Sequence, residues 1–170
     1  MLETSQLYTL YIDPSVVTTD WRRSRVLVVS SLTMDGAEHT LAAYDLAIEQ
    51  GADFIEPDLV ITRDGVLVAR HESEISRTTD VAARKEFADR RRRQVIDGTP
   101  VEGWFTEDFT LAELKTLRAR ERLPKLRSTD HDGQYDIPTF EEILTLLVRA
   151  NKGRDTVRRT VALGKRLIHP

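Results

Sequence analysis

The sequence contains no cysteine, which excludes disulfide bonds, thiolate chemistry and zinc sites built on cysteine. It also lacks any apolar run near the roughly 20 residues that a membrane-spanning helix needs. Lys and Arg number 25 against 28 Asp and Glu, so the net charge of −3 creates no basic field that would recruit nucleic acid. Residues 1–6 have neither the positively charged start nor the apolar stretch of a secretory signal peptide. As written, the N-terminus therefore indicates a cytoplasmic location.

The composition is typical of a globular protein with a core of its own. The chain has 170 residues, of which 40% are hydrophobic and 31% are charged. This length and balance favour one folded domain. The sequence has no glycine-rich phosphate loop, no nucleophile elbow and no zinc-ligand spacing. Any chemistry must therefore come from other constellations of residues.

The pattern of apolar residues predicts an α/β fold. Strand and helix patterns alternate through the first half of the chain, as in proteins with strand–helix–strand units. The expected elements are, in order, a strand over 26–29, a loop over 30–36, a helix over 38–50 that stops at Gly51, a strand over 54–61, a turn over 63–65 and a strand over 66–69.

Three other segments depart from this alternation. Residues 1–24 show no clear period and are expected to form an irregular leader, so that the folded domain extends over 25–170. Residues 81–135 are rich in charge, and we interpret them as an excursion from the main fold rather than as core. Beyond residue 153 the pattern decays into a basic tail.

Capping boxes predict two helices in the second half of the chain. Thr110 stands three residues before Glu113 and is expected to open a helix that runs through Leu117. Thr139 and Glu142 have the same spacing and open a second helix. The buried stripe of this second helix is expected to consist of Ile143, Leu144, Leu147 and Val148.

Two carboxylates form the first candidate site. Glu56 and Asp58 stand two apart on a predicted strand, so both point to the same face. Carboxylate oxygens are the ligands that calcium and magnesium prefer, so the pair is a reasonable half of a metal site. The alternative is a strand face that is merely exposed to solvent. The mostly apolar neighbours, such as Phe54 and Leu59, make such a wet face unusual.

A histidine lies within reach of this pair if the next turn is tight. If residues 64–65 close a two-residue hairpin, Asp58 lies opposite His71, and directly opposed Cβ atoms are about 5 Å apart. His71 would then be a general acid or base beside a metal. If the strands are instead parallel strands of a barrel, this pairing fails, although both ends can still converge at one rim.

The remaining candidates are weaker. The arginine run over 90–93 could bind phosphate or nucleic acid, yet a charge run of this length is typical of a solvated helix face. His39, His131 and His169 have no metal-ligand spacing to one another.

Several stretches resemble the glycerophosphodiester phosphodiesterase family in order and spacing, over roughly residues 37–150. The stretches that carry the resemblance are AEHTLAAY at 37–44, GADFIEPD at 51–58, TRDGVLVARHE at 62–72, RTTDV at 77–81, WFTEDFTL at 104–111, ELK at 113–115 and IPTFEE at 137–142. The segment over about 81–135 resembles the insertion of a larger, often periplasmic, branch of this family.

The resemblance implies a fold, a reaction and a set of site residues. The fold is a partial TIM-type (β/α) barrel with an inserted irregular and helical segment. The reaction is hydrolysis of a glycerophosphodiester to an alcohol and glycerol 3-phosphate, with calcium or magnesium bound. Glu56 and Asp58 correspond to metal ligands, and His71 corresponds to one of two catalytic histidines. Glu38 corresponds to an auxiliary residue at the same mouth of the barrel.

Two motifs of the family are missing. After its first strand the family has His-Arg-Gly, where a gapless count places Val29, Ser30 and Ser31 in this chain. The family also has a later metal-ligating glutamate in a Glu-Thr-Lys-like stretch, and no glutamate follows Glu142 here. A full barrel takes about 250 residues, so this chain would supply only its first strands.

These departures leave alternatives open. The chain is either an active metal-dependent phosphodiesterase or an inactive remnant or binding module of the same fold. An incomplete barrel exposes strand edges, which fits a truncated or frame-displaced gene product as well as a homo-oligomer that covers its open edges. The location also stays open, because the family branch favours the periplasm.

Overall fold

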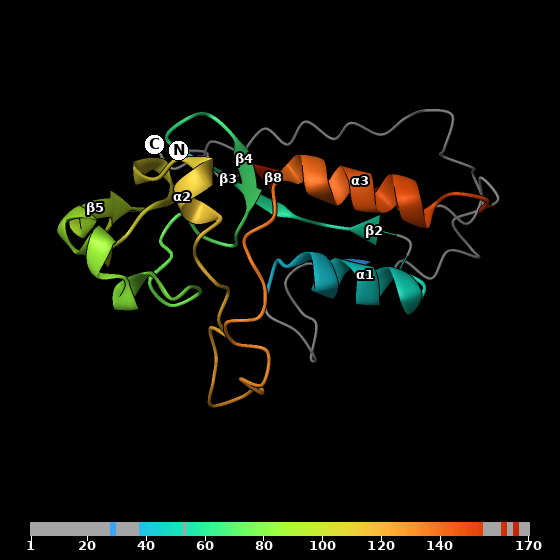
Figure 1. The fold of residues 1–170 in the computed structure, drawn as a ribbon, viewed down its shortest axis with the longest axis horizontal. Coiled ribbons are helices and arrows are strands. Elements are labelled where there is room, and N and C mark those ends of the chain that lie inside the picture. The colour runs from blue at the N-terminus through green and yellow to red at the C-terminus, as the bar shows by residue number, and fades with distance from the viewer. Residues whose placement is uncertain (1–27, 30–37, 53, 155–160, 163–164, 167–170) are drawn as a thin grey trace, which may run out of the picture.

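The computed structural model describes residues 28–29, 38–52, 54–154, 161–162 and 165–166 (Figure 1). The predictions for the leader over 1–24, the loop over 30–36 and His169 lie outside the described residues.

A small parallel sheet begins the domain. Strands β1 (Val28–Val29), β2 (Phe54–Ile55) and β7 (Val161–Ala162) pair in the order β1-β2-β7. Helix α1 (Leu41–Glu49) connects β1 to its parallel neighbour β2. Parallel neighbours require such a crossover, and this one is a βαβ unit. The predicted alternation of strand and helix is confirmed here.

A second sheet is mixed. Strand β3 (Asp58–Ile61) pairs antiparallel with β4 (Leu67–Ala69) and parallel with β8 (Lys165–Arg166). Both β7 and β8 come from the segment beyond residue 153. The interpretation of that segment as a tail without pattern is therefore wrong at these two strands.

The strand expected over 54–61 is interrupted. It divides into β2 and β3 at Glu56 and Pro57, and the two halves belong to different sheets. Proline has no N–H to donate to a neighbouring strand, so the ladder breaks there. The strand alternation that was expected to place Glu56 and Asp58 on one face therefore does not apply.

The hairpin of β3 and β4 has a longer loop than expected. Thr62 N–H donates to Val66 O at 2.9 Å, so three residues form the loop. Leu59 pairs with Ala69, which shifts the register by one residue. Asp58 consequently lies opposite Arg70, whose N–H donates to Asp58 O at 3.0 Å, and the predicted pairing with His71 is wrong.

Helix α1 begins later than the sequence predicts. Thr40 is its N-cap and accepts a hydrogen bond from Ala43 N–H at 3.3 Å. The preceding residue, His39, has a left-handed φ of 54°, which no helical residue adopts. The predicted stop is confirmed, because Gly51 has a φ of 88° directly after the helix.

Helix α3 (Phe140–Ala150) packs beside α1 against β3 and β4 (Figure 1). Its capping box at Thr139 is confirmed. Its buried side consists of Ile143, Leu146 and Leu147. The prediction is therefore wrong for Leu144 and Val148, which are 41% and 75% exposed. The buried residues of this cluster are Tyr44, Ala47, Ile48, Ala52, Ile55, Leu59, Ala69, Ile143, Leu146 and Leu147.

The segment over 81–135 contributes to the core, contrary to its interpretation as an excursion. Its charged residues dominate the composition, but its few apolar ones converge on the outer face of the β3–β4 hairpin. The second buried cluster consists of Val60, Val68, Ile75, Val81, Phe87, Trp104, Phe109, Leu114, Leu117 and Ile137.

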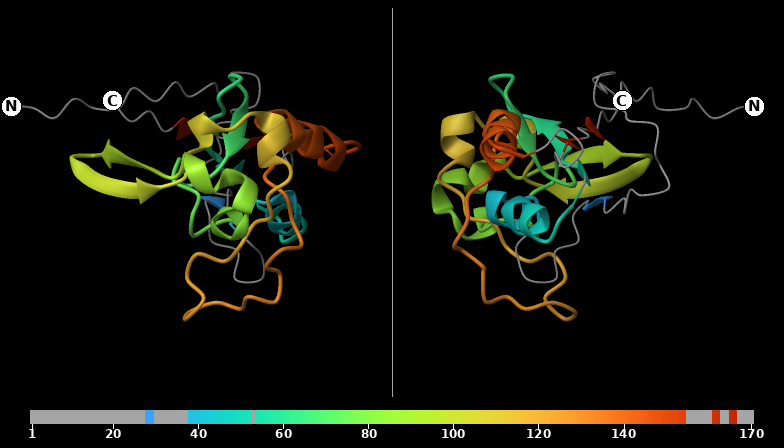
Figure 2. Two further views of the ribbon diagram at one scale, coloured as in Figure 1. Left: turned by 60° about the vertical axis from the view of Figure 1, so that its left-hand side comes forward. Right: turned by 90° about the vertical axis from the view of Figure 1, so that its right-hand side faces the viewer.

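The elements of this segment are short. A hairpin of β5 (Arg92–Ile96) and β6 (Thr99–Gly103) projects from the body of the molecule (Figure 2). The 3₁₀ helices are η1 (Val81–Ala83), η2 (Lys85–Arg90) and η3 (Thr106–Asp108). The capping box at Thr110 is confirmed, but helix α2 (Leu111–Leu114) ends before the predicted Leu117.

Across the described residues, no helix combines the length and the apolar character that crossing a membrane requires.

Candidate functional site

Buried acids and a histidine meet where several elements begin or end. Glu38 and His39 precede α1, Asp58 is the first residue of β3, and His71 follows β4. Glu38 and His39 are each 2% exposed, and Asp58 is 7% exposed. The Nε2 atom of His39 lies 3.5 Å from Asp58 Oδ2 and 3.8 Å from Glu38 Oε1. We call Glu38, His39, Asp58 and His71 the acid–imidazole cluster.

Tyr44 holds the ring of His39 from the opposite side. Its hydroxyl lies 2.6 Å from His39 Nδ1, one turn into α1. Burial, and next the charge of Asp58, raise the pKa of Tyr44 well above its ordinary value. Tyr44 therefore keeps its hydroxyl proton at any ordinary pH.

His71 stands at the more open side of the cluster. Its ring centroid lies 6.4 Å from that of His39, and its side chain is 34% exposed. Its Nδ1 lies 2.9 Å from Glu72 Oε1. An ionised carboxylate can only accept, so Nδ1 carries a proton and donates it to Glu72. This contact fixes the ring and leaves Nε2 as the nitrogen available for a substrate.

Two arginines bring positive charge to the cluster. Arg70, 1% exposed, donates from Nη1 to the backbone oxygen of Glu38 at 3.4 Å. Burial lowers the pKa of Arg70 to about 10, and the nearby Glu38 opposes this shift. Arg122 forms an ion pair with Glu38, with Nε 3.1 Å from Oε2. The negative charge of the buried Glu38 carboxylate is thus offset by the ion pair with Arg122 and by the nearby charge of Arg70.

The loop that carries Arg122 is tied to the chain just after His71. Ala119 forms a β-bridge with Thr79, and Arg120 N–H donates to Thr78 O at 2.9 Å. Asp132 closes the loop by accepting from Glu121 N–H at 2.7 Å. These bonds explain how a residue more than 80 positions from Glu38 reaches it.

Glu56 has a half-buried side chain between β2 and β3. Its negative charge is among those that raise the pKa of Tyr44, which places it within electrostatic reach of the cluster. The four residues predicted for the site are therefore near one another, and their roles stay predictions. His39 is the residue that sequence reasoning missed. Its position between Glu38 and the N-cap Thr40 was the available signal.

The acids of the site suit a hard cation in kind. Within the described part of the chain, both carboxylate oxygens of Glu38 are buried without a hydrogen bond, and Oε2 has only the ion pair with Arg122. Such oxygens are the donors that calcium and magnesium take. Among the described residues, however, no three acidic or histidine side chains are arranged to hold one ion together. Carboxylates are thus the right kind of ligand for calcium or magnesium, but the described residues supply only part of a ligand set.

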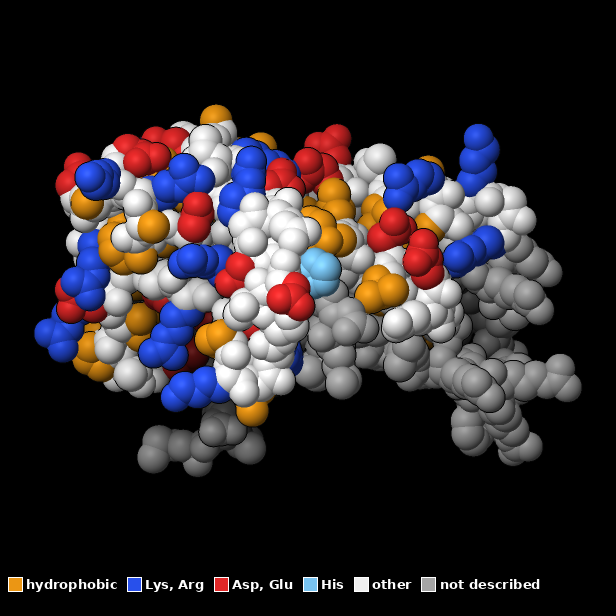
Figure 3. All heavy atoms as spheres, turned by 60° about the horizontal axis from the view of Figure 1, so that its bottom comes forward, with side chains coloured by type: hydrophobic (Ala, Val, Ile, Leu, Met, Phe, Trp, Pro, Cys, Tyr) orange, Lys and Arg blue, Asp and Glu red, His pale blue; other side chains and the backbone are white. Residues whose placement is uncertain are grey.

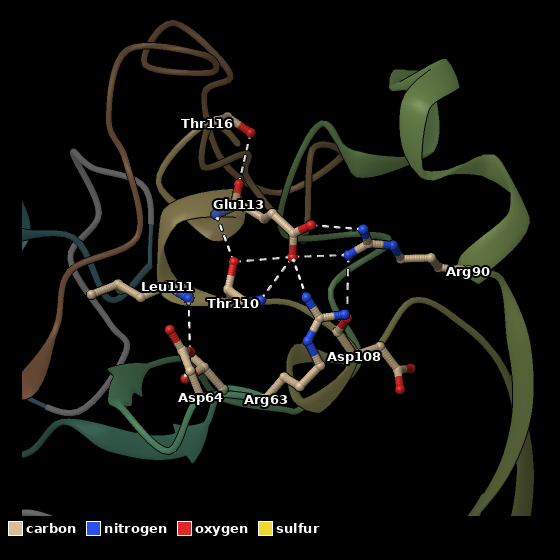
Figure 4. A network of polar contacts seen from close by, with 9 residues as sticks. Arg63, Asp64, Arg90, Asp108, Thr110, Leu111, Glu113 and Thr116 are labelled. Carbon is tan, nitrogen blue, oxygen red and sulfur yellow. Dashed lines mark hydrogen bonds and ion pairs between the residues drawn. The ribbon is translucent and has the colours of Figure 1, made fainter.

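The arginine run over 90–93 is not the solvated helix face that we expected. It spans the end of η2 and the start of β5. The guanidinium carbon of Arg90 lies 5.1 Å from the ring centroids of both Phe87 and Phe109. Arg90 also donates from Nη2 to Glu113 Oε1 at 2.7 Å (Figure 4).

Arg92 has a similar structural role. It donates from Nε to Asp108 Oδ2 at 2.6 Å, and its guanidinium carbon lies 4.6 Å from the ring centroid of Phe105. On the face shown in Figure 3, basic side chains alternate with acidic ones rather than gathering in a single patch. Packing of the inserted segment accounts for Arg90 and Arg92.

His131 belongs to a turn over 130–134. Its ring is tilted against that of Tyr135, with centroids 6.0 Å apart, and within the described residues no contact joins it to the acid–imidazole cluster. A groove of about 650 Å³ lies between α1, α2 and α3. None of its lining side chains belongs to the acid–imidazole cluster, so it contributes nothing to this site.

Comparison with known proteins gives a consistent result. The model of the glycerophosphoryl diester phosphodiesterase family matches residues 30–158. A glycerophosphodiester phosphodiesterase of Arabidopsis thaliana is 48% identical over 113 residues, which cover 66% of this chain and 30% of that protein. A glycerophosphodiester phosphodiesterase of Bacillus subtilis is 32% identical over 126 residues, which cover 71% of this chain and 36% of that protein. The chain thus spans about a third of the length of these relatives.

A solved structure agrees on the fold. A phosphodiesterase of Oleispira antarctica, in complex with the product sn-glycerol-3-phosphate, matches with a TM-score of 0.51 and 24% identity. The match covers 82% of this chain and 44% of that one.

Proposed function

The chain belongs to the glycerophosphoryl diester phosphodiesterase family, and on that basis we propose that it hydrolyses glycerophosphodiesters to an alcohol and glycerol 3-phosphate. The observation that carries the proposal is the acid–imidazole cluster, in which His39 Nε2 lies 3.5 Å from Asp58 and the His71 ring lies 6.4 Å from that of His39. Buried acids beside imidazoles are costly unless they are paired or bind a ligand, and such groups cluster at functional sites.

The acids have the role of holding a divalent cation. Glu56 and Asp58 are the proposed ligands, and Glu38 is an auxiliary acid at the same place. When bound, calcium or magnesium would neutralise the phosphate oxygens and so lower the barrier to attack. Arg122, whose side chain is 31% exposed, adds positive charge on the open side of Glu38.

His71 has the role of general acid. In this role His71 is an imidazolium: Nδ1–H donates to Glu72, and the proton on Nε2 passes to the leaving alkoxide oxygen, which leaves a neutral imidazole. Its partial exposure, 34% of the side chain, leaves this nitrogen accessible to a small substrate.

The test is release of glycerol 3-phosphate from glycerophosphocholine with calcium, with magnesium and with a chelator. We expect metal-dependent turnover and a loss of about 10²–10⁴-fold in kcat for His71→Ala. The matched control is His131→Ala, which removes a histidine outside the cluster and should leave kcat unchanged. Equal loss in both variants would contradict the assignment of His71.

A binding module is the second candidate function. Its support is the Val29-Ser30-Ser31 sequence where the family has His-Arg-Gly, so the second histidine and the arginine of that motif are missing. In that case folded protein would bind glycerol 3-phosphate, measured by calorimetry, and release none from glycerophosphocholine.

A further inference from the structure

We propose that His39 is a positioning residue of the site, which directs an N–H from Nε2 to the carboxylate of Asp58 while Tyr44 holds the ring from the other side. The proposal rests on the proposed function, because Asp58 matters there as a ligand for a cation. His39 itself touches neither the cation nor the substrate in this role.

The ring of His39 has a defined orientation. Both His39 and Tyr44 are 2% exposed, and the Tyr44 hydroxyl is 2.6 Å from Nδ1. A buried bond of this length leaves the imidazole little freedom to rotate. Nε2 consequently has a fixed direction, toward Asp58 and Glu38.

The surroundings of Nε2 determine which nitrogen carries the proton. Asp58 Oδ2 and Glu38 Oε1 lie 3.5 and 3.8 Å away. A bare lone pair on Nε2 would face two anions, so Nε2 carries a hydrogen. Nδ1 then accepts the hydroxyl proton of Tyr44, which burial keeps on the oxygen.

Nε2 is a donor without a full hydrogen bond. It is buried, and within the described residues it has no hydrogen-bond partner. The 3.5 Å to Asp58 is longer than the usual 2.7–3.2 Å of about linear N–H···O bonds. Ligating carboxylates are commonly held by such outer hydrogen bonds.

The backbone gives a second, independent indication of constraint. His39 has a φ of 54°, in the left-handed region that favours glycine and asparagine. Histidine is among the side chains that adopt this region more often than most, and non-glycine residues held there cluster at functional sites.

Two substitutions separate positioning from a purely structural role. In His39→Gln the side-chain amide reaches about as far as Nε2 and keeps an N–H toward Asp58. In His39→Asn the amide ends near the place of Nδ1, but the backbone tolerates the positive φ better. A structural role predicts that His39→Asn is the better variant in every measurement.

The first measurement is calcium affinity, by calorimetry on the full chain, together with the thermal midpoint. We expect His39→Asn to be the more stable variant but to raise the calcium Kd by about 10–100-fold, and His39→Gln to raise it by less than about 10-fold. The proposal would be overturned if both variants bound calcium as tightly as the wild type. It would also be overturned if the more stable variant, His39→Asn, bound calcium more tightly than His39→Gln.

The second measurement needs no cation. Imidazole nitrogen shifts of metal-free protein report whether Nε2 of His39 is protonated. We expect a proton on Nε2 and signals that move in Tyr44→Phe but not in the control Tyr135→Phe. A bare Nε2 would overturn the proposal. If the wild type neither binds calcium nor releases glycerol 3-phosphate, the proposed function fails instead, and these shifts alone decide whether His39 directs its N–H at Asp58.

Discussion

Glu113 connects three parts of the chain through one carboxylate (Figure 4). It accepts from Arg90 at 2.7 and 3.0 Å and from the backbone N–H of Thr110 at 2.8 Å, which closes the capping box of α2. Arg63 lies 3.3 Å from the same carboxylate. The hydrogen bonds from Arg90, and next that from the Thr110 N–H, lower the pKa of Glu113 from 4.5 to about 2.

Glu113→Gln is expected to lower the free energy of unfolding near neutral pH by about 1–2 kcal/mol, since a side chain that is 26% exposed is partly screened by water. The folded-state pKa lies below the unfolded one, so the contribution is complete above about pH 4.5 and is lost as the pH falls toward about 2. Urea unfolding across this range checks it. A difference from wild type that grows on acidification would contradict the assignment.

Arg122→Ala tests the charge balance at Glu38. Without Arg122, the buried carboxylate loses the ion pair at 3.1 Å. Leaving a buried charge without its partner is destabilising, here by about 1–3 kcal/mol because Arg122 itself is 31% exposed. Denaturant unfolding measures the change. Arg120→Ala, from an exposed neighbour on the same loop, is the control, and an equal loss in both variants would refute a specific role for Arg122.

Among the elements, the loop between β3 and β4 determines which residues of the two strands pair with each other. Gly65 has a φ of 82°, and an added Cβ would meet nothing within 4 Å. Gly65→Ala is therefore expected to destabilise the fold by about 1 kcal/mol through backbone strain alone, and Gly65→Asn by less. Urea midpoints compare the two variants. If alanine proved as stable as glycine, the three-residue loop would be wrong.

Local signals in the sequence were sufficient for some elements and not for others. The capping boxes at Thr110 and Thr139 and the glycine stop at Gly51 depend on neighbouring residues only, and each is confirmed. The register of β3 and β4 depends on one loop residue, which sequence spacing does not resolve. The buried face of α3 depends on where the sheet lies, which explains the exposure of Leu144 and Val148.

The site as a whole combines near and distant residues. The family stretches alone point to Glu38, Glu56, Asp58 and His71, whose roles stay predictions. They could not show that Arg122 pairs with Glu38, because that contact depends on how the inserted loop folds back onto Thr78 and Thr79. They contain His39 beside Glu38, but they could not show its role, because its contacts with Tyr44 and Asp58 exist only in the folded chain.

The charged composition of the insertion concealed its core. Arginines and acids dominate residues 81–135, yet Phe109, Leu114 and Leu117 are completely buried there. Average composition does not report such positions, because a few apolar side chains are enough to build a cluster when their neighbours pair with one another.

The most direct test of the account is a phosphorus NMR time course of glycerophosphocholine with the wild-type chain and with Asp58→Asn, in calcium and in chelator. We expect the wild-type chain to release glycerol 3-phosphate in calcium and not in chelator, and Asp58→Asn in calcium to release it at a rate lower by about 10²-fold or more. Turnover that is equal in the two proteins, or that continues in chelator, would contradict the assignment of this cluster as the catalytic site.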